Sequence, residues 1–210
     1  MISKIRPVVI IGAGGHGKEV LEALTLSPSY RILGFIDEDK SIIGKKLLGI
    51  PVLGNLNWMQ ENIDSNTGCI CAIGTNQIRK DIVSRLQGRF TFVNAIHPTA
   101  FVSPSAKLGR GITAGIRAVI NTEASIGNHV IINTLASISH DVKVHDFCNL
   151  NPGSTVAGKV HLGEGAYIGA NSTVIQNLSI GDWSVIGAGA VVIRDVEHGK
   201  KVAGVPAIPI

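Results

Sequence analysis

"VINTEASIGNHVIINTLASISHDVKV", residues 119–144, places an aliphatic side chain at every sixth position. These positions are Ile120, Ile126, Ile132, Ile138 and Val144. The same spacing runs from Ile96 to Val192, where sixteen of seventeen such positions hold Ile, Leu or Val and the exception is Ala114. A six-residue period kept over about a hundred residues indicates a solenoid rather than an ordinary β-sandwich.

The hexad predicts a triangular coil whose flat sides are each one hexad long. We expect the aliphatic residue, and a small or apolar residue four places later, to point inward. Gly or Asn often follows the aliphatic residue directly, and we expect these residues at tight corners with left-handed backbone angles. Three hexads, or 18 residues, then complete one turn, so residues 18 apart stack and most strand edges are paired.

Two His-Asp pairs interrupt this pattern in "SISHDVKVHD", residues 137–146. His140 lies two places after Ile138, at an outward position with Thr122 and Gly158 in the adjacent coils. The small Gly158 leaves room for a substrate beside the imidazole. His145 occupies the slot directly after an aliphatic residue and is interpreted as a corner residue, so His140 is the preferred functional histidine.

The remaining histidines of the solenoid carry no such pattern. They are expected to be solvated surface residues: His129, His145, His161 and His198.

Residues 1–93 follow a different rule, with strands and helices in alternation. Strands are predicted at 7–12, 31–37, 68–74 and 90–96. Helices are predicted at 15–26, with Val20, Leu21 and Leu24 on one face, and at 75–86, where Thr75 or Asn76 would cap the helix. The apolar positions of the second helix are Ile78, Ile82, Val83 and Leu86. This alternation predicts an α/β domain with a small parallel sheet.

"GAGGHG", residues 12–17, lies between the first predicted strand and helix and matches G-x-G-x-x-G. Glycines there let the backbone approach a phosphate at a helix N-terminus. Asp37 ends the second strand, where a carboxylate would bind ribose in a dinucleotide fold. Alone, this motif favours NAD, but the half is short for a full dinucleotide domain and His16 is unusually polar for that loop. A purely structural tight turn is the other alternative.

Composition excludes several classes. The net charge is +4 with scattered Lys and Arg and no basic stripe with aromatics, so nucleic acid is not expected as a partner. Three cysteines, Cys69, Cys71 and Cys148, favour reduced core thiols, and no Cys/His set has zinc spacing. Neither a signal peptide nor a membrane-spanning stretch is recognised, so a cytoplasmic location is expected.

Several motifs occur together in one family: "VVIIGAGGHGKEV", "GFIDED", "AIGTNQIRKDI", the hexad array, "SISHD" and "VAGVPA". In this order they resemble the bacterial hexapeptide-repeat sugar acyltransferases, typified by UDP-4-amino-sugar N-acetyltransferases, with sialic acid O-acetyltransferases as relatives. The resemblance implies a Rossmann-like nucleotide-sugar domain at 1–93 and a left-handed parallel β-helix at 94–210 that binds acetyl-CoA. It also implies a homotrimer with active sites between subunits.

The resemblance implies roles for individual residues. His140 would be the general base and Asp141 its carboxylate partner. Because consecutive strand residues face opposite sides, Asp141 can assist only if the backbone bends there or the residues meet across a subunit contact. The acetyl-CoA residues would be Asn149, Gly158, Ala170 and Ala188, and the nucleotide-sugar residues Gly14, Gly15, His16, Asp37, Glu38, Gly74 and Asn76.

The expected reaction is transfer of acetyl from acetyl-CoA to the amino group of a nucleotide-linked 4-amino-4,6-dideoxy sugar, without a metal. Imidazole suits the proton transfer, and a Gly158 N–H would stabilise the carbonyl oxygen as it turns negative. The family has His where this chain has Asn149, which can still hydrogen-bond the acetyl oxygen or the thioester region but cannot titrate. Relatives often have Lys where this chain has Ile208, which weakens the expectation of a charge contact to the cofactor phosphates. O-acetylation of a sugar such as sialic acid, a nucleotide-binding oxidoreductase and a non-catalytic scaffold remain alternatives.

Overall fold

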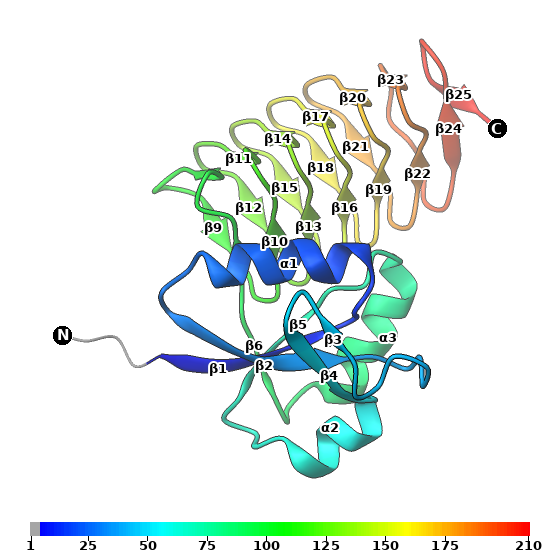
Figure 1. Ribbon diagram of the computed structural model, residues 1–210. Helices are drawn as coiled ribbons and strands as arrows, with labels where there is room; N and C mark the ends of the chain where they lie inside the picture. The colour runs from blue at the N-terminus through cyan, green and yellow to red at the C-terminus, as the bar shows by residue number, and fades with distance from the viewer. Residues whose placement is uncertain (1–4) are drawn as a thin grey trace. The chain divides into compact units, whose positions relative to one another are not determined.

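The computed structural model describes residues 5–210. The chain forms two compact units, Met1–Pro98 and Thr99–Ile210. The first holds the three helices and the second is built from stacked short strands (Figure 1).

The first unit is an α/β domain. Its elements are β1 (Arg6–Ile11), α1 (Gly15–Thr25), β2 (Tyr30–Ile36), β3 (Lys46–Leu47), β4 (Ile50–Gly54), α2 (Leu56–Asn62), β5 (Gly68–Cys71), α3 (Asn76–Leu86), β6 (Thr91–Phe92) and β7 (Ala95–Ile96). The sheet order is β3-β4-β2-β1-β5-β6, and every pairing but β3 with β4 is parallel. The predicted α/β fold is confirmed.

A buried aliphatic core holds this domain together. Val8 and Ile10 of β1 and Ile70 of β5 are fully buried, and Val20 and Leu24 of α1 pack in the same cluster. Burial of such side chains stabilises the folded state by roughly 1.5–3 kcal/mol each. The sheet therefore fixes the ends of β1, β2 and β5 and, with them, the starts of the loops that follow these three strands.

Two local predictions in this unit were wrong, those for residues 90–96 and for Ile78, whereas the cap at Thr75 was confirmed. Residues 90–96 form two strands instead of one, because β6 pairs with β5 while β7 joins the eight-stranded sheet described below. Thr75 is the N-cap of α3 but makes no side-chain capping bond. Ile78 is 50% exposed instead of buried, since the buried face of α3 consists of Asn76, Arg79, Val83 and Leu86.

The β3–β4 hairpin and α2 were not predicted. The β3–β4 turn contains Leu48 and Gly49, both with positive φ, and the two paired strands are short. The sequence did contain a signal for the start of α2, because Asn is a common N-cap residue. Asn55 accepts a hydrogen bond from the Trp58 N–H (2.9 Å) as a regular N-cap.

The second unit is a parallel solenoid. Its strands are β8 (Phe101–Val102), β9 (Lys107–Leu108), β10 (Thr113–Ala114), β11 (Val119–Ile120), β12 (Ser125–Ile126), β13 (Ile131–Ile132), β14 (Ser137–Ile138), β15 (Lys143–Val144), β16 (Asn149–Leu150), β17 (Thr155–Val156), β18 (His161–Leu162), β19 (Tyr167–Ile168), β20 (Thr173–Val174), β21 (Ser179–Ile180), β22 (Val185–Ile186), β23 (Val191–Val192), β24 (Lys201–Ala203) and β25 (Ile208–Pro209).

Three sheets form the sides of the coil. An eight-stranded sheet runs from β7 through β10, β13 and β16 to β25, a six-stranded one contains β14 and β17, and a five-stranded one contains β15 and β18. Ile138 pairs with Ile120 and with Val156, so the predicted 18-residue stacking is confirmed. Successive coils stack along the solenoid (Figure 1). This arrangement is typical of the predicted left-handed parallel β-helix.

The corners differ from the prediction in one respect. The left-handed residues lie three places after the inward aliphatic residue, as in Glu123, Asp141 and Lys159, and many are not glycine. Glycine directly after the aliphatic residue serves close packing instead. A Cβ on Gly127 would lie 2.7 Å from the Asp146 nitrogen of the next coil. Space between coils, rather than backbone angle, therefore selects glycine there.

His129 was also wrongly predicted to be a solvated surface residue. It is 7% exposed and stacks on Phe147, with ring centroids 5.2 Å apart. His129 and Phe147 occupy the same left-handed corner position in adjacent coils, which brings their rings into register. His145, His161 and His198 are exposed, as predicted.

All three cysteines are buried, and none of them forms a disulfide within residues 5–210. Burial raises the pKa of Cys69 and raises that of Cys71 to about 12. Both thiols therefore stay protonated at neutral pH. None of the helices in residues 5–210 is long and apolar enough to cross a membrane.

Candidate functional site

The pair His140-Asp141 lies at the corner between β14 and β15. Ile138 points inward and is fully buried, whereas the His140 and Asp141 side chains are 60% and 40% exposed. Asp141 has φ 60°, so the backbone turns sharply between the two residues. The His140 Nδ1 lies 2.8 Å from the Asp141 Oδ2. The backbone bend that lets Asp141 reach His140 is therefore present within a single chain.

Hydrogen bonding to His140 is the main cause that lowers the pKa of Asp141, and the charges of His140 and Lys159 lower it further. Asp141 is therefore an ionised carboxylate at neutral pH and can only accept a hydrogen bond. This assigns the proton to Nδ1 of a neutral His140 and leaves a lone pair on Nε2.

Gly158 lies against the His140 ring in the next coil. A Cβ built on Gly158 would be 2.7 Å from both the Cε1 and the Nε2 of His140. The corner connects the coils through the Lys159 N–H, which donates to the His140 carbonyl oxygen (3.1 Å). The glycine thus leaves the space that the imidazole occupies.

Gly158 is one of the four expected acetyl-CoA residues, and the other three lie elsewhere on the solenoid. Asn149 is on β16 of the eight-stranded sheet and is 4% exposed. Ala170 and Ala188 follow β19 and β22 at the corner between the eight- and six-stranded sheets, and their positions stack in adjacent coils. The His140 corner lies between the six- and five-stranded sheets. Within one chain, the His140-Asp141 pair and these two alanines therefore lie at different corners.

The glycine-rich loop joins β1 to α1. Gly12 has φ 103°, and a Cβ on Gly17 would lie 2.1 Å from the Gly12 carbonyl oxygen, so these two glycines are required by the turn. Gly14 and Gly15 face open space, with no atom within 4 Å of a built Cβ. The loop therefore combines a fixed turn with an uncovered backbone beside the N-terminus of α1.

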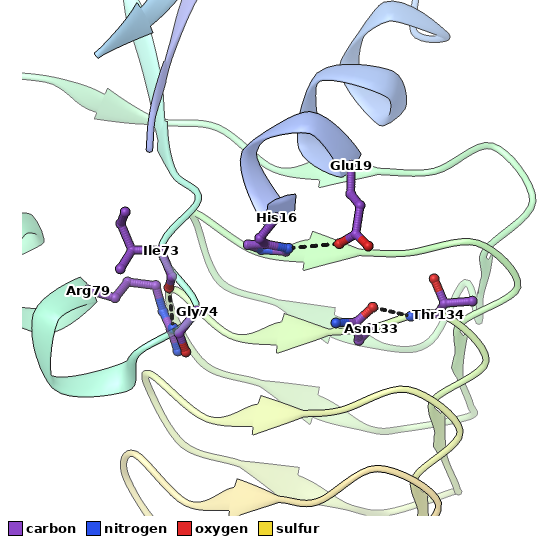
Figure 2. A network of polar contacts seen from close by, with 7 residues as sticks. All are labelled: His16, Glu19, Ile73, Gly74, Arg79, Asn133 and Thr134. Carbon is purple, nitrogen blue, oxygen red and sulfur yellow. Dashed lines mark hydrogen bonds and ion pairs between the residues drawn. The ribbon is translucent and has the colours of Figure 1, made fainter. Parts of the chain in front are cut away.

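His16 is the second residue of α1. Its side chain is 17% exposed, and its Nδ1 lies 3.2 Å from Glu19 Oε2 (Figure 2). Burial lowers its pKa despite the opposing effect of Glu19. His16 is therefore neutral at physiological pH.

Asp37 and Glu38 bind backbone groups. Asp37 accepts hydrogen bonds from the Ala13 N–H at Oδ2 (2.8 Å) and from the Asp39 N–H at Oδ1 (2.9 Å). Asp37 thus ties the glycine-rich loop to the end of β2. Glu38 Oε1 accepts from the Leu56 N–H at 3.1 Å.

Gly74 and Asn76 lie between β5 and α3, beside a buried arginine that the sequence analysis missed. Arg79 is fully buried and its Nη1 donates to the carbonyl oxygens of Ile73 (2.7 Å) and Gly74 (3.3 Å), as Figure 2 shows. The sequence did contain a signal for the burial of Arg79, because its helical spacing from Asn76 and Val83 places it on the buried face of α3. Arg79 holds the turn that carries Gly74.

A cavity of about 250 Å³ lies where β1, β2 and β5 end. Gly12, Asp37 and Glu38 contribute to it. Its apolar wall consists of Ile11, Ile36, Leu56, Ile73, Ile78 and Ile82. Among residues 5–210 no group of three or more His, Cys, Asp or Glu side chains is arranged to hold a metal ion.

Known proteins match both halves of the chain. The family described as "PglD N-terminal domain" matches residues 7–86, and "Bacterial transferase hexapeptide (six repeats)" matches residues 159–194. A GDP-perosamine N-acetyltransferase from Caulobacter crescentus, solved as a histidine-to-alanine variant with CoA and GDP-perosamine, is 36% identical with a TM-score of 0.92. That match covers 98% of this chain and 97% of the other. The chain belongs to the PglD-type hexapeptide-repeat sugar N-acetyltransferase family.

Two other relatives of this PglD-type chain extend the comparison. The acetyltransferase domain of PglB from Neisseria gonorrhoeae, solved with acetyl coenzyme A, is 33% identical over 98% of this chain and 99% of that one, with a TM-score of 0.90. UDP-N-acetylbacillosamine N-acetyltransferase from Bacillus subtilis is 36% identical over 109 residues, which cover 51% of this chain and 50% of that protein. A mimivirus protein, L142, is 31% identical over 24% of its own length. The chain thus matches half or less of these two curated relatives.

Proposed function

We propose that the protein transfers acetyl from acetyl-CoA to the 4-amino group of a nucleotide-linked 4-amino-4,6-dideoxy sugar. The observation that carries this proposal is the exposed His140 with its Nδ1 2.8 Å from an ionised Asp141. The relatives support the chemistry, since their names describe sugar N-acetyltransferases and one was solved with acetyl coenzyme A. Two of the sugar-bound structures carry substitutions of a histidine, which fits a histidine in the reaction.

In this mechanism the Asp141 carboxylate fixes the His140 tautomer and orients the ring. The amino nitrogen of the sugar attacks the thioester carbon, and His140 Nε2 accepts the proton that this nitrogen loses. The tetrahedral intermediate then expels the thiolate, which takes the proton from the imidazolium and leaves as the free thiol. The amide product and the free thiol balance the reaction.

The carbonyl oxygen becomes negative during the attack and requires a hydrogen-bond donor. The Gly158 N–H donates no hydrogen bond to the residues that the structure describes, and Gly158 lies directly beside the His140 ring. We assign this N–H to the oxyanion.

Acetyl-CoA would run along the corner that carries Ala170 and Ala188. Ala188 is exposed and Ala170 half-buried, and a Cβ on the adjacent Gly189 would meet no atom within 4 Å. Small side chains in successive coils give an extended pantetheine arm an unobstructed path. Since this corner differs from that of His140, the complete site would be formed by two copies of the chain in a homotrimer.

Nucleotide and sugar are assigned to the first unit, at Gly14, Gly15, His16, Asp37, Glu38, Gly74 and Asn76. The backbone at Gly14 and Gly15, where a built Cβ meets no atom within 4 Å, leaves room for the diphosphate beside the N-terminus of α1. Asp37, whose oxygens hold the loop, would act mainly by positioning that loop.

A thiol-release assay tests the reaction directly. The protein is mixed with acetyl-CoA and either UDP- or GDP-linked 4-amino-4,6-dideoxy sugars or sialic acid, and the acetylated product is identified by mass spectrometry. The proposal predicts amide formation on the amino sugar. Acetylation confined to sialic acid hydroxyls, or no thiol release with any sugar, would contradict it.

A further inference from the structure

The corner that carries the His140-Asp141 pair has a charged side chain in each adjacent coil. Glu123, between β11 and β12, and Lys159, between β17 and β18, lie 18 residues before and after Asp141. All three have left-handed backbones, with φ 57°, 60° and 60°. The Asp141 N–H donates to the Thr122 carbonyl oxygen and the Lys159 N–H to that of His140, both at 3.1 Å, so the three corners stack. Glu123, Asp141 and Lys159 are called the charged column below.

Within the charged column, Asp141 interacts with both of its neighbours. The hydrogen bond with His140 is the main cause that lowers the pKa of Asp141, and the charge of Lys159 and a side-chain contact with Glu123 within hydrogen-bonding reach lower it further. The Glu123 N–H donates to Ser105 Oγ of the preceding coil (3.1 Å), which fixes the Glu123 backbone. Both neighbours therefore act on the carboxylate that orients the imidazole.

The charged column is not neutral. Glu123 and Lys159 are exposed, so at neutral pH the column contains two carboxylates and one ammonium group. One negative charge is thus in excess beside a neutral His140. When Nε2 of His140 accepts the proton of the substrate, the imidazolium balances this charge. Two unit charges about 4 Å apart attract by about 1 kcal/mol even in bulk water.

Other side chains around the pair add one constant charge. Ser105 and Asn177 continue the charged column at its two ends and are uncharged. The outward side chains of β11, β14 and β17 are also uncharged: Val119, Ser137 and Thr155. On the next side of the coil β15 presents Lys143, and the exposed His145 follows it. Neither of these two is altered in the variants below.

We infer that Glu123 and Lys159 are positioning residues that act on His140 through Asp141 and in opposite directions. The Glu123 carboxylate favours the imidazolium that forms during acetyl transfer, and the Lys159 ammonium group disfavours it. This inference rests on the proposed function, since it concerns the proton that the same histidine accepts.

Single neutral substitutions test the two directions. The base must be unprotonated to act, so the acid limb of the pH profile of kcat/KM follows the protonation of the free enzyme. Glu123→Gln should move this limb about half a pH unit to lower pH, and Lys159→Gln about half a unit to higher pH. Both side chains are exposed, so both variants should fold. Unmoved limbs, or limbs moved in the same direction, would overturn the inference.

Two controls show that charge causes these shifts. Glu197→Gln removes an exposed carboxylate several coils away and should leave the profile unchanged. Lys159→Arg keeps the positive charge and should also keep the wild-type profile. Raising the ionic strength from about 0.02 M to about 0.5 M should shrink both shifts, because salt screens exposed charges.

The double variant Glu123→Gln with Lys159→Gln separates charge from structure. It has the same net charge as the wild type, so the two opposite shifts should cancel and the acid limb should return to within about 0.2 pH unit of the wild-type position. Structural disturbances would add instead. A double variant that lies further from the wild type than either single variant would contradict the role of charge.

NMR of the full chain gives a readout that does not depend on activity. The ring signals of His140 are assigned by their loss in His140→Ala, and the pH at which they are half titrated should move as the acid limb does. Unchanged ring titrations in an active enzyme would overturn this inference and leave acetyl transfer intact. Shifted titrations without thiol release from any sugar would uphold the charged column and remove the proposed function.

Discussion

The left-handed conformation of Asp141 lets two consecutive side chains meet. In an extended strand His140 and Asp141 would point to opposite faces, but φ 60° at Asp141 brings its Oδ2 to 2.8 Å from the ring. The same corner position is left-handed in Glu123 and Lys159 of the adjacent coils. A left-handed residue at this corner is thus part of the solenoid repeat, and at Asp141 it brings the carboxylate to the His140 ring.

Gly158→Ala should lower the activity of the protein but leave its stability nearly unchanged. The added Cβ would lie 2.7 Å from the His140 Nε2, and the exposed ring can rotate away but then leaves Asp141. We expect kcat of acetyl transfer to fall at least about tenfold. Thermal unfolding should change little, because a flexible side chain absorbs the clash. An unchanged kcat would show that the ring position is not required.

His16 predicts a pH dependence of stability. Burial lowers its pKa below 6.5 in the folded chain, so the unfolded chain binds this proton more readily. The stabilising contribution is fully present above pH 6.5 and is lost progressively as the pH falls from 6.5 toward the lower pKa of the folded chain. Urea unfolding at about pH 7.5 and 5.5 should therefore show a larger loss of unfolding free energy in the wild type than in His16→Gln. Equal losses in the two proteins would contradict the buried neutral imidazole.

At the scale of the elements, the aliphatic column stabilises the coil. Ile138 is fully buried and stacks between Ile120 and Val156. On the neighbouring strand of the same sheet Thr155, one place before the inward Val156, is exposed. Inward and outward positions therefore alternate within strands of only two residues.

Ile138→Asp should unfold this part of the solenoid. It buries an unpaired carboxylate among aliphatic side chains, which costs at least about 3 kcal/mol of unfolding free energy. The exposed Thr155→Asp on the neighbouring strand is the matched control and should stay within about 0.5 kcal/mol of the wild type. Chemical denaturation measures both. A normal midpoint for Ile138→Asp would mean that the inward register is wrong.

The hexad period made the solenoid predictable because one rule repeats in every coil. The position of the left-handed corner was not predictable from composition, since Glu, His, Leu, Asp, Phe, Lys and Trp all occupy it. The α/β half was predicted in outline from its apolar runs. Its short strands and the exposed Ile78 depend on tertiary pairing and on the cavity, which a helical period alone does not encode.

The site was only partly accessible from sequence for a similar reason. His140 and its stacking on Gly158 follow from the 18-residue period, and that stacking is present. Arg79 escaped notice because a charged residue in a helix is normally solvated, whereas here backbone carbonyls bind it in the interior. The engagement of Asp37 by Ala13 and Asp39 required the loop conformation.

For the whole molecule, the separation of His140 from Ala188 leads to a complementation experiment. His140→Ala removes the base, and Ala188→Trp blocks the proposed path of acetyl-CoA. If each site is formed by two copies in a cyclic oligomer, mixed oligomers of these inactive variants contain sites with both functional halves. Random mixing in equal amounts should restore about a quarter of the wild-type activity.

The control is the same mixture assembled without exchange of subunits, which should stay inactive. Light scattering gives the oligomeric state of each sample. No recovery after demonstrated subunit exchange would show that a single chain contains the whole site.

The most direct measurement is the single-turnover rate of acetyl transfer in His140→Ala at saturating substrates. Because the His140 side chain is 60% exposed, the variant should keep the melting temperature of the wild type. The transfer rate should fall at least about a hundredfold, and added imidazole should restore part of it. A folded His140→Ala protein that transfers acetyl at the wild-type rate would contradict the central role of this histidine.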